Sequence, residues 1–184
     1  MKLYTDVDFA ARTSGTAYRA TGPVAVRPAL PGDLSACGSL LARHIGGDPD
    51  SYAMLLRRQI DSGTLIFAAV QSTAVIGFSK LTWLTPEADG GRNAPDGWYL
   101  SGILVDSMHR RRGVGWQLTR ARCDWVWRVA SEAFFVMHPD NRASRLLHAR
   151  AGFTELTRDF QVPGVTFSDG PGVLFRSRQG RSEE

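Results

Sequence analysis

Apolar residues three and four positions apart predict the first helices of this chain. A helix is expected over 34–45, directly after a turn at 28–33 whose Asp33 is placed to cap it. Its buried stripe is expected to hold Leu34, Cys37, Leu40, Leu41 and Ile45. The glycines and proline of 46–50 should end this helix, and a shorter helix is expected over 52–59.

Two later segments carry the same helical period. From about Gly113 the pattern predicts a helix with one apolar face and one arginine face. The apolar face is expected to hold Val114, Leu118, Ala121, Trp125 and Val129, and the solvent face Arg120, Arg122 and Arg128. A short helix is expected over 141–150.

Runs rich in β-branched and aromatic residues predict the strands. They are expected at 24–27, 64–70, 75–83, 98–105, 133–137, 152–156 and 172–176. The run 98–105 is almost continuously apolar, which is typical of a central strand covered on both faces. The order is strand, two helices, three strands, helix, strand, helix and two strands, which predicts a mixed α/β domain around one central sheet.

Composition limits the domain organisation and the compartment. The 184 residues, 43% of them hydrophobic, suit a single domain over 23–177, between an N-terminal lead-in at 1–22 and a flexible tail at 178–184. No apolar stretch is long enough to span a bilayer, and 1–22 lacks the layout of a secretory signal. Cys37 and Cys123 have no disulfide or zinc spacing. We therefore expect a cytoplasmic protein without metal or membrane partner.

Charge directs attention to one segment. The net charge of +4 comes from scattered arginines, which argues against a nucleic-acid partner, and the one cluster is Arg110-Arg111-Arg112. It is followed by Gly113-Val114-Gly115, between a buried strand and an amphipathic helix. Glycines let backbone amides approach an anion, and a helix start adds partial positive charge. The segment predicts a phosphate site, although it matches neither the ATP nor the dinucleotide loop pattern.

This segment resembles the acetyl-CoA signature of the GCN5-related N-acetyltransferase (GNAT) superfamily, Arg/Gln-x-x-Gly-x-Gly/Ala, at Arg110, Gly113 and Gly115. The superfamily also has an Asn-x-x-Ala/Ser helix that ends in Gly-Phe, and 141–153 matches it. The resemblance covers 98–153 in motif and 24–176 in element order. It implies the GNAT fold, in which a mostly antiparallel central sheet, splayed at a cofactor cleft, is flanked by about four helices.

The resemblance also implies roles for individual residues. The backbone of Ile103, Leu104 and Val105 would pair with the pantetheine arm of acetyl-CoA, the co-substrate, as an added strand does. The amides of 110–115 would hold the pyrophosphate, and Arg111 and Arg112 could reach cofactor phosphates. Asn141 would contact the pantetheine and Ser144 would lie beside the cofactor, although both residues could instead serve only in capping the helix, which Asn141 could do as well.

One departure from the family concerns proton transfer. Where many members have a tyrosine that protonates the leaving thiolate, this chain has His148, which could serve as that acid or only pack at a helix end. The acceptor amine must also lose a proton. Spacing does not choose among the candidates for its base, which are Glu155, Asp159, Asp169, His138 and Tyr99; we take Glu155 and Asp159 as the catalytic candidates beside His148.

The acceptor is expected to be a small cationic amine. Glu87, Asp89 and Asp96 make one loop acidic in a basic chain, and carboxylates around a cleft would attract a cation. The runs 98–106, 118–122 and 157–167 also resemble acetyltransferases that act on aminoglycosides, including the kasugamycin-modifying kind. The alternatives are a peptide N-terminus or lysine as acceptor, and a non-catalytic acetyl-CoA-binding module. The resemblance leaves a homodimer open.

Overall fold

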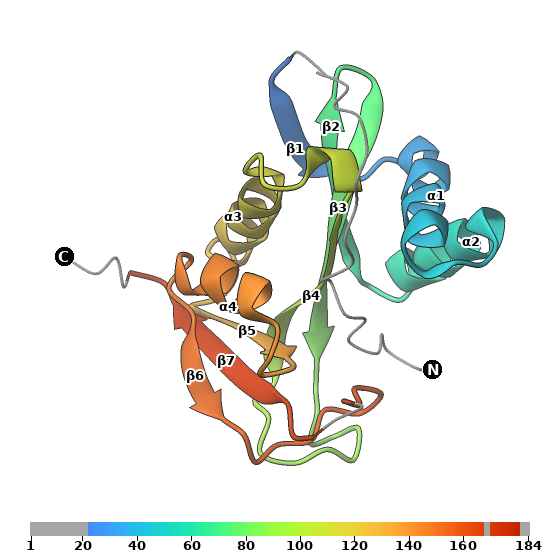
Figure 1. The fold of residues 1–184 in the computed structure, drawn as a ribbon. Coiled ribbons are helices and arrows are strands. Elements are labelled where there is room, and N and C mark those ends of the chain that lie inside the picture. Colours follow the sequence, from blue (N-terminus) through green and yellow to red (C-terminus); the bar gives the residue numbers. More distant parts are fainter. Residues whose placement is uncertain (1–21, 168–169, 181–184) are drawn as a thin grey trace. The chain divides into compact units, whose positions relative to one another are not determined.

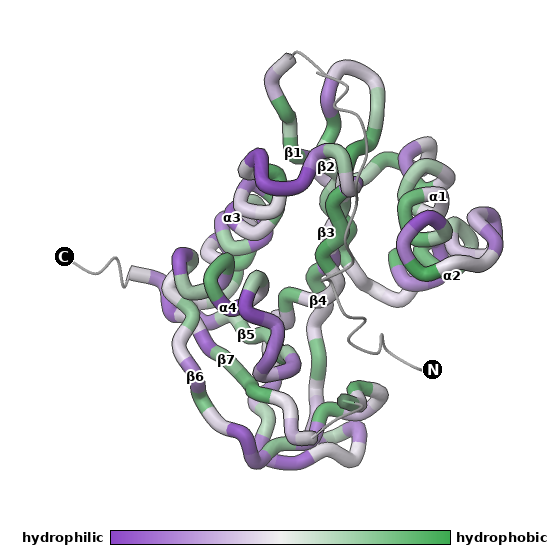
Figure 2. The backbone as a smooth tube through the Cα atoms, in the orientation of Figure 1, coloured by the Kyte–Doolittle hydropathy of each residue, from purple (hydrophilic) through white to green (hydrophobic). Residues whose placement is uncertain are grey.

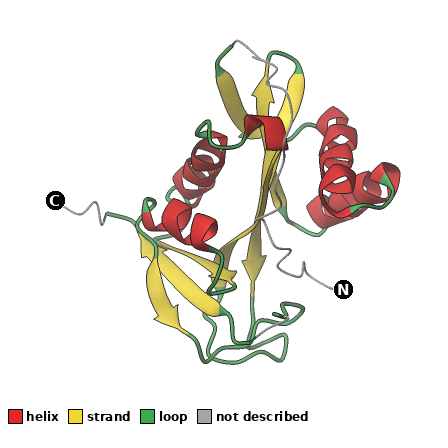
Figure 3. Cartoon of the chain, viewed as in Figure 1, coloured by secondary structure: helices red, strands yellow, loops and turns green. Residues whose placement is uncertain are grey.

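The computed structural model describes residues 22–167 and 170–180 (Figure 1). The elements, coloured by type in Figure 3, follow the order that the sequence predicts. They are β1 (Val24–Pro28), the 3-10 helix η1 (Pro31–Asp33), α1 (Leu34–Ile45), α2 (Pro49–Asp61), β2 (Leu65–Gln71), β3 (Ala74–Leu84), β4 (Gly97–Val105), the 3-10 helix η2 (Ser107–His109), α3 (Val114–Val126), β5 (Glu132–Met137), α4 (Arg142–Ala149), β6 (Thr154–Thr157) and β7 (Val173–Arg178).

The seven strands form one sheet in the order β1-β2-β3-β4-β5-β7-β6. The pairs β1–β2, β2–β3, β5–β7 and β6–β7 are antiparallel, and β4 and β5 are parallel. The β4–β5 register pairs Trp98 with Ala133 and Tyr99 with Phe134, at the starts of both strands. The predicted mixed α/β fold, with a mostly antiparallel sheet and four α-helices in the described residues, is confirmed.

The described chain forms two compact units. The N-terminal unit comprises 22–81 and 102–122, and the C-terminal unit comprises 82–101, 123–167 and 170–180. Each unit is described by itself below. No helix among these residues is long and apolar enough to cross a bilayer. The predicted lead-in falls outside the described residues except for Gly22, and β7 runs through Arg178, the first residue of the predicted tail.

Close contact between α1 and α2 organises one side of the N-terminal unit. The apolar stripe of α1 is buried from Leu34 to Leu41. Gly38 lies where α2 approaches most closely, because a Cβ built there would come within 2.9 Å of the Ala53 nitrogen. Within this unit, Figure 1 shows α1 and α2 on one side of β3 and α3 on the other.

The core of the C-terminal unit is largely aromatic. Tyr99 and Phe134 pack with Ala94, Val162 and Leu174 in one buried cluster. In a second group, Phe135 stacks on Phe175 at a centroid distance of 4.6 Å and meets Phe153 edge-on. Through these contacts, β5, β7 and the chain after α4 pack against one another.

Arg122 is the main correction to the helix prediction. It was expected on the solvent face of α3, but it is 1% exposed. Its guanidinium donates to the carbonyl oxygens of Lys80 (3.1 Å) and Leu118 (3.4 Å) and to the Thr119 hydroxyl (3.2 Å). These acceptors satisfy the buried N–H groups. These bonds allow the arginine to lie inside the unit, although its charge would by itself favour a position in solvent.

Three smaller expectations were also wrong. Val129 lies beyond the end of α3 and is 58% exposed, and Ile45, the last residue of α1, is 37% exposed. Asp33 does not cap α1 with its side chain. Its carboxylate instead accepts from the Leu30 amide and from the Arg27 guanidinium, across the 3-10 turn before the helix. Fraying at helix ends and the extra 3-10 turn account for these differences.

Candidate functional site

The junction between β4 and α3 in the N-terminal unit has the backbone geometry of an anion site. After η2, the backbone has positive φ at Arg111 (61°) and Gly113 (81°), with Arg112 between them. Such alternation turns successive N–H groups toward one side. In the first hydrogen bond of α3, the Gln117 amide donates to the Gly113 carbonyl. The amides of Gly113, Val114 and Gly115 precede it, so the helix offers them no carbonyl acceptor.

The arginines of this loop differ in position. Arg110 is half-buried, and its Nε donates to the Val105 carbonyl at 3.1 Å, which ties the loop back to β4. Arg111 and Arg112 are exposed, as is Gly113. Figure 2 shows the segment leading into α3 as a hydrophilic stretch (purple). The loop thus presents two guanidinium groups and a helix start to solvent, a combination that suits a phosphate.

Asp106, which the sequence patterns missed, holds the start of this loop. Its carboxylate accepts from the Met108 amide at 3.0 Å and from Arg43 of α1 at 2.9 Å, and it lies 3.7 Å from Nδ1 of His109. An aspartate at the first position of a short turn is a capping signal that could have revealed it. Through Arg43, the loop is anchored to α1 within the same unit.

The end of β4 places its backbone groups on two edges. The Asp106 amide donates to the Ile76 carbonyl of β3 at 2.9 Å. Backbone groups of neighbouring strand residues point to opposite edges. The N–H and C=O of Leu104 therefore face β3, whereas those of Ile103 and Val105 face away from it. Leu104 is buried, and its two neighbours are half-buried.

In the C-terminal unit, α4 presents the second predicted motif. The Asn141 side chain accepts from the Ser144 amide at 3.0 Å, so it caps α4 as one of its two predicted roles requires. At the other end, the Gly152 amide bonds the Ala149 carbonyl and the Phe153 amide bonds the His148 carbonyl, with Gly152 at φ 77°. This is a Schellman ending, which explains the Gly-Phe sequence.

His148 lies inside this unit, 3% exposed. Its ring stacks on Phe135 at 3.9 Å and meets Phe153 edge-on at 5.6 Å. Nδ1 is 2.9 Å from the Ser144 carbonyl oxygen and 3.2 Å from the Ser144 hydroxyl. A carbonyl oxygen only accepts, so Nδ1 carries the hydrogen and Nε2 is the nitrogen left for proton exchange. The ring thus has a packing role and one defined tautomer.

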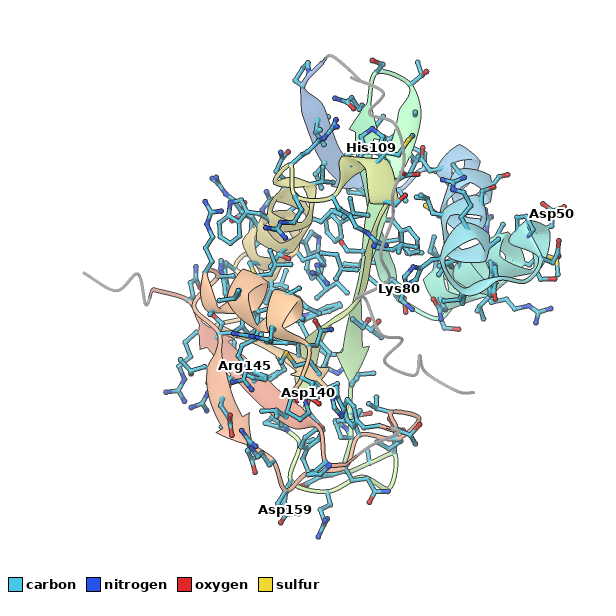
Figure 4. The ribbon with its side chains drawn as sticks, in the orientation of Figure 1. Asp50, Lys80, His109, Asp140, Arg145 and Asp159 are labelled. Atoms are coloured by element: carbon cyan, nitrogen blue, oxygen red, sulfur yellow. The ribbon has the colours of Figure 1, made fainter. Side chains whose placement is uncertain are left out.

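The carboxylates proposed as bases are both paired with arginine. Glu155 lies on β6 and bonds Arg158 at 2.7 Å, which lowers the pKa of its carboxyl group. Asp159, labelled in Figure 4, bonds Arg92 at 2.7 Å and accepts from Asn93 at 3.2 Å. Both carboxylates therefore lie in ion pairs with arginine on the surface of the C-terminal unit.

The remaining base candidates lie in different surroundings. The hydroxyl of Tyr99 is buried and donates to the Pro95 carbonyl at 2.7 Å, and burial, with the charge of Asp96, raises its pKa. His138 lies with Nδ1 3.7 Å from Asp140. Asp169 lies outside the described residues. Tyr99 is thus a poor base, because its proton is held in a buried hydrogen bond.

Solved structures share the fold at low sequence identity. They include an aminoglycoside N-acetyltransferase (TM-score 0.65, 16% identity, covering 85% of this chain and 97% of that chain). They also include the phosphinothricin acetyltransferase of Sinorhizobium meliloti in complex with acetyl-CoA (TM-score 0.63, 14% identity, 84% and 88%). A third is the ribosomal-protein-alanine N-acetyltransferase of Brucella melitensis (TM-score 0.62, 17% identity, 84% and 99%).

Sequence comparison gives the family. The Arabidopsis thaliana protein named "Probable N-acetyltransferase HLS1-like" is 33% identical over 69 residues, which cover 36% of this chain and only 16% of that protein. The model of the Acetyltransferase (GNAT) family matches residues 38–153, more than half of the chain and both motifs described above. The chain therefore belongs to the Acetyltransferase (GNAT) family, as its two motifs predict.

Proposed function

We propose that this protein transfers an acetyl group from acetyl-CoA to a small cationic amine, of the aminoglycoside type of amino sugar. The observation that carries the proposal is the β4–α3 junction, where positive φ at Arg111 and Gly113 aligns amides at a helix start beside exposed arginines. Such a junction suits a diphosphate, and acetyl-CoA supplies one together with the acetyl group.

Within the N-terminal unit, the cofactor roles divide between strand and loop. The N–H and C=O of Ile103 and Val105 face the edge away from β3, so we assign pantetheine pairing to these two residues, with Leu104 anchoring the strand between them. The pyrophosphate is assigned to the amides of 113–115. Arg111 and Arg112 are assigned to phosphates, and Arg110 to holding the loop against β4.

Residues of the C-terminal unit supply the remaining roles. Asn141, which caps α4, and Ser144, which bonds His148, are assigned to the pantetheine side of the co-substrate. His148 is assigned to protonating the departing CoA thiolate through Nε2, which requires the imidazolium form of the ring, because Nδ1 keeps its hydrogen in the bond to the Ser144 carbonyl. No covalent enzyme intermediate is needed: the amine attacks the thioester carbonyl directly.

The acceptor amine is the finer part of the proposal. The acidic loop with Glu87, Asp89 and Asp96 gives the C-terminal unit carboxylates that would attract a polycationic amine. Glu155 and Asp159 are also the carboxylates that the sequence offers as candidate acceptors of the amine proton, directly or through water. The resemblance of 98–106, 118–122 and 157–167 to aminoglycoside-modifying enzymes points to the same substrate class.

The acceptor is tested by thiol release from acetyl-CoA with kasugamycin, kanamycin, spermidine and a peptide with a free N-terminus. Turnover is expected with an aminoglycoside. Turnover with the peptide alone would reject an aminoglycoside as the acceptor. Binding of CoA without turnover of any amine would favour a non-catalytic acetyl-CoA-binding module.

The cofactor site is tested by two matched glycine variants. Gly113→Ala forces an alanine to positive φ at a position with open space around it, so it alters the loop backbone without a clash. Gly63→Ala imposes the same strain, at φ 93° and again in open space, after α2. Both should lose about 1–2 kcal/mol of stability. In calorimetry, only Gly113→Ala should weaken CoA binding, by about tenfold or more. If the two variants bound CoA with the same affinity, the loop would be rejected as the cofactor site.

A further inference from the structure

Lys80 brings an amino group into the interior of the N-terminal unit. It lies on β3, 5% exposed, in a chain whose only other lysine is Lys2. Figure 4 labels it beside β3 on the side of α2, and its Nζ lies 3.4 Å from Oε1 of Gln59, itself a buried residue of α2. Lysine is seldom buried without a reason, because the charged form loses its hydration.

Gly102 on β4 makes the room for this side chain. A Cβ built on Gly102 would come within 2.6 Å of Cε and 3.4 Å of Nζ of Lys80, and φ at Gly102 is +47°. Glycine adopts this positive φ inside a strand without strain, because it has no side chain. The amino group therefore lies against β4 immediately before Ile103, where the segment assigned to the pantetheine begins.

The groups around Lys80 come from four elements. Gln59 of α2 is neutral, β2 pairs Lys80 with Ile66, and β4 presents Gly102. Arg122 of α3 contacts the backbone of Lys80, because its guanidinium donates to the Lys80 carbonyl. Burial lowers the pKa of Lys80 from 10.5 to about 8. A neutral amine is thus accessible near physiological pH, which no arginine in this chain offers.

We propose that Lys80, as a neutral amine, accepts the proton that the acceptor amine loses when it attacks the thioester of acetyl-CoA. This rests on the proposed function. The acceptor nitrogen forms a bond to the carbonyl carbon and becomes positively charged, and its proton passes to Nζ of Lys80. The C–S bond then breaks, CoA leaves as a thiolate that takes up a proton, and Lys80 returns its own proton to solvent.

The assignment competes with the two carboxylates. The pKa of Glu155 is lowered by Arg158, and a weaker base removes a proton from an ammonium or a tetrahedral adduct less readily. Burial of Lys80 has a different consequence: a fraction of its side chain is neutral near physiological pH, and with a pKa of about 8 that amine is still a stronger base than either carboxylate. The Lys80 amine also lies against Gly102 of β4, directly before Ile103.

The test compares Lys80→Met and Lys80→Arg with wild type, using acetyl-CoA and the aminoglycoside that releases thiol fastest in the panel. Both variants should lose about 10²–10⁴-fold in kcat. Their affinity for CoA in calorimetry should stay within about twofold of wild type, which also shows that they fold. Added methylamine should restore turnover of Lys80→Met in proportion to its concentration, with the acetylated aminoglycoside measured by mass spectrometry so that acetylation of methylamine itself is not counted.

Four results would overturn the assignment. Lys80→Arg with wild-type kcat would mean that only positive charge is needed, and Lys80→Met with wild-type kcat would mean that the amine is not needed. Failure of methylamine to restore turnover would argue against proton transfer at this position. Stoichiometric acetylation of Lys80 during turnover would make it a nucleophile instead of a base. Failure of the proposed function is distinct: wild type would then release no thiol with any amine.

Discussion

Lys80 and Arg122 place two basic side chains inside the N-terminal unit, and they are linked through the Lys80 carbonyl. Neither burial follows from local sequence. The helical pattern around Arg122 places a charged residue on the solvent face by default. Its actual position depends on acceptors from β3 and from α3 itself, which only the folded chain brings together. Lys80 likewise needs Gly102, which is 22 positions away along the chain.

The stability of this protein should depend on the protonation of Lys80. Its native pKa is lowered to about 8 from 10.5, so between these values the unfolded chain binds more protons and stability rises with pH. Below pH 8 the burial penalty is fully present. Lys80→Met should therefore be more stable than wild type at pH 7, by up to about 3 kcal/mol. Urea denaturation should show the difference shrinking toward pH 10.5, and a constant difference would contradict it.

Arg122→Leu should be destabilising, in spite of removing a buried charge. The Lys80 carbonyl and the Thr119 hydroxyl would lose a donor, at a cost of about 1–3 kcal/mol for each buried group left unsatisfied. Arg120→Leu is the matched control on the same helix, because Arg120 is exposed, and it should change stability by about 0.5 kcal/mol or less. Thermal denaturation of both variants measures the contrast, and equal effects would contradict it.

Two substitutions of His148 can distinguish its packing role from its chemical role. His148→Phe keeps a ring that can stack on Phe135 but removes both nitrogens, whereas His148→Ala loses the packing as well. If Nε2 protonates the thiolate, both variants should lose about 10²–10⁴-fold in kcat, with a smaller change in affinity for acetyl-CoA. Steady-state kinetics and calorimetry measure the two quantities. Wild-type kcat in His148→Phe would leave His148 with packing alone.

At the level of elements, most of the chain could be predicted from periodicity because its helices and strands are amphipathic or continuously apolar. The bounds of α1, β4 and α4 follow from their start and stop residues, and the Gly152-Phe153 ending of α4 is readable as a sequence motif. The 3-10 turn η2 could not be predicted in this way, because three residues carry no period. Its only signal is the cap at Asp106.

The packing of α1 on α2 gives a prediction at the element scale. Alanine favours a helix over glycine by about 1 kcal/mol, so Gly38→Ala would stabilise an isolated α1. In this unit the new methyl group meets the backbone of Pro49 and Ala53, and the helices must separate. A net loss of about 1–3 kcal/mol is expected. Gly32→Ala, with open space around it, is the control; a stabilised Gly38→Ala would show that the helices give way freely.

For the molecule as a whole, the fold and the family motif could be predicted from the sequence, whereas the residue that we propose as the base could not. The strand–loop–helix motif is contiguous in sequence, so its glycines and arginines can be recognised without coordinates, and the family that the motif predicts is confirmed. A proton acceptor is defined by its surroundings. Glu155 and Asp159 could be named from the sequence as candidate carboxylates, but their arginine partners could not be predicted. Lys80 gave no local signal at all.

The residues at positions 102 and 80 are expected to depend on each other in evolution. The hydrogen in place of a side chain at position 102 is what admits the long methylene chain from position 80. Homologues that carry a bulkier residue at 102 are therefore expected to have a shorter one at 80, and those with lysine to have kept glycine opposite. Covariation between these two columns would trace where in the family a lysine at 80 arose or was lost.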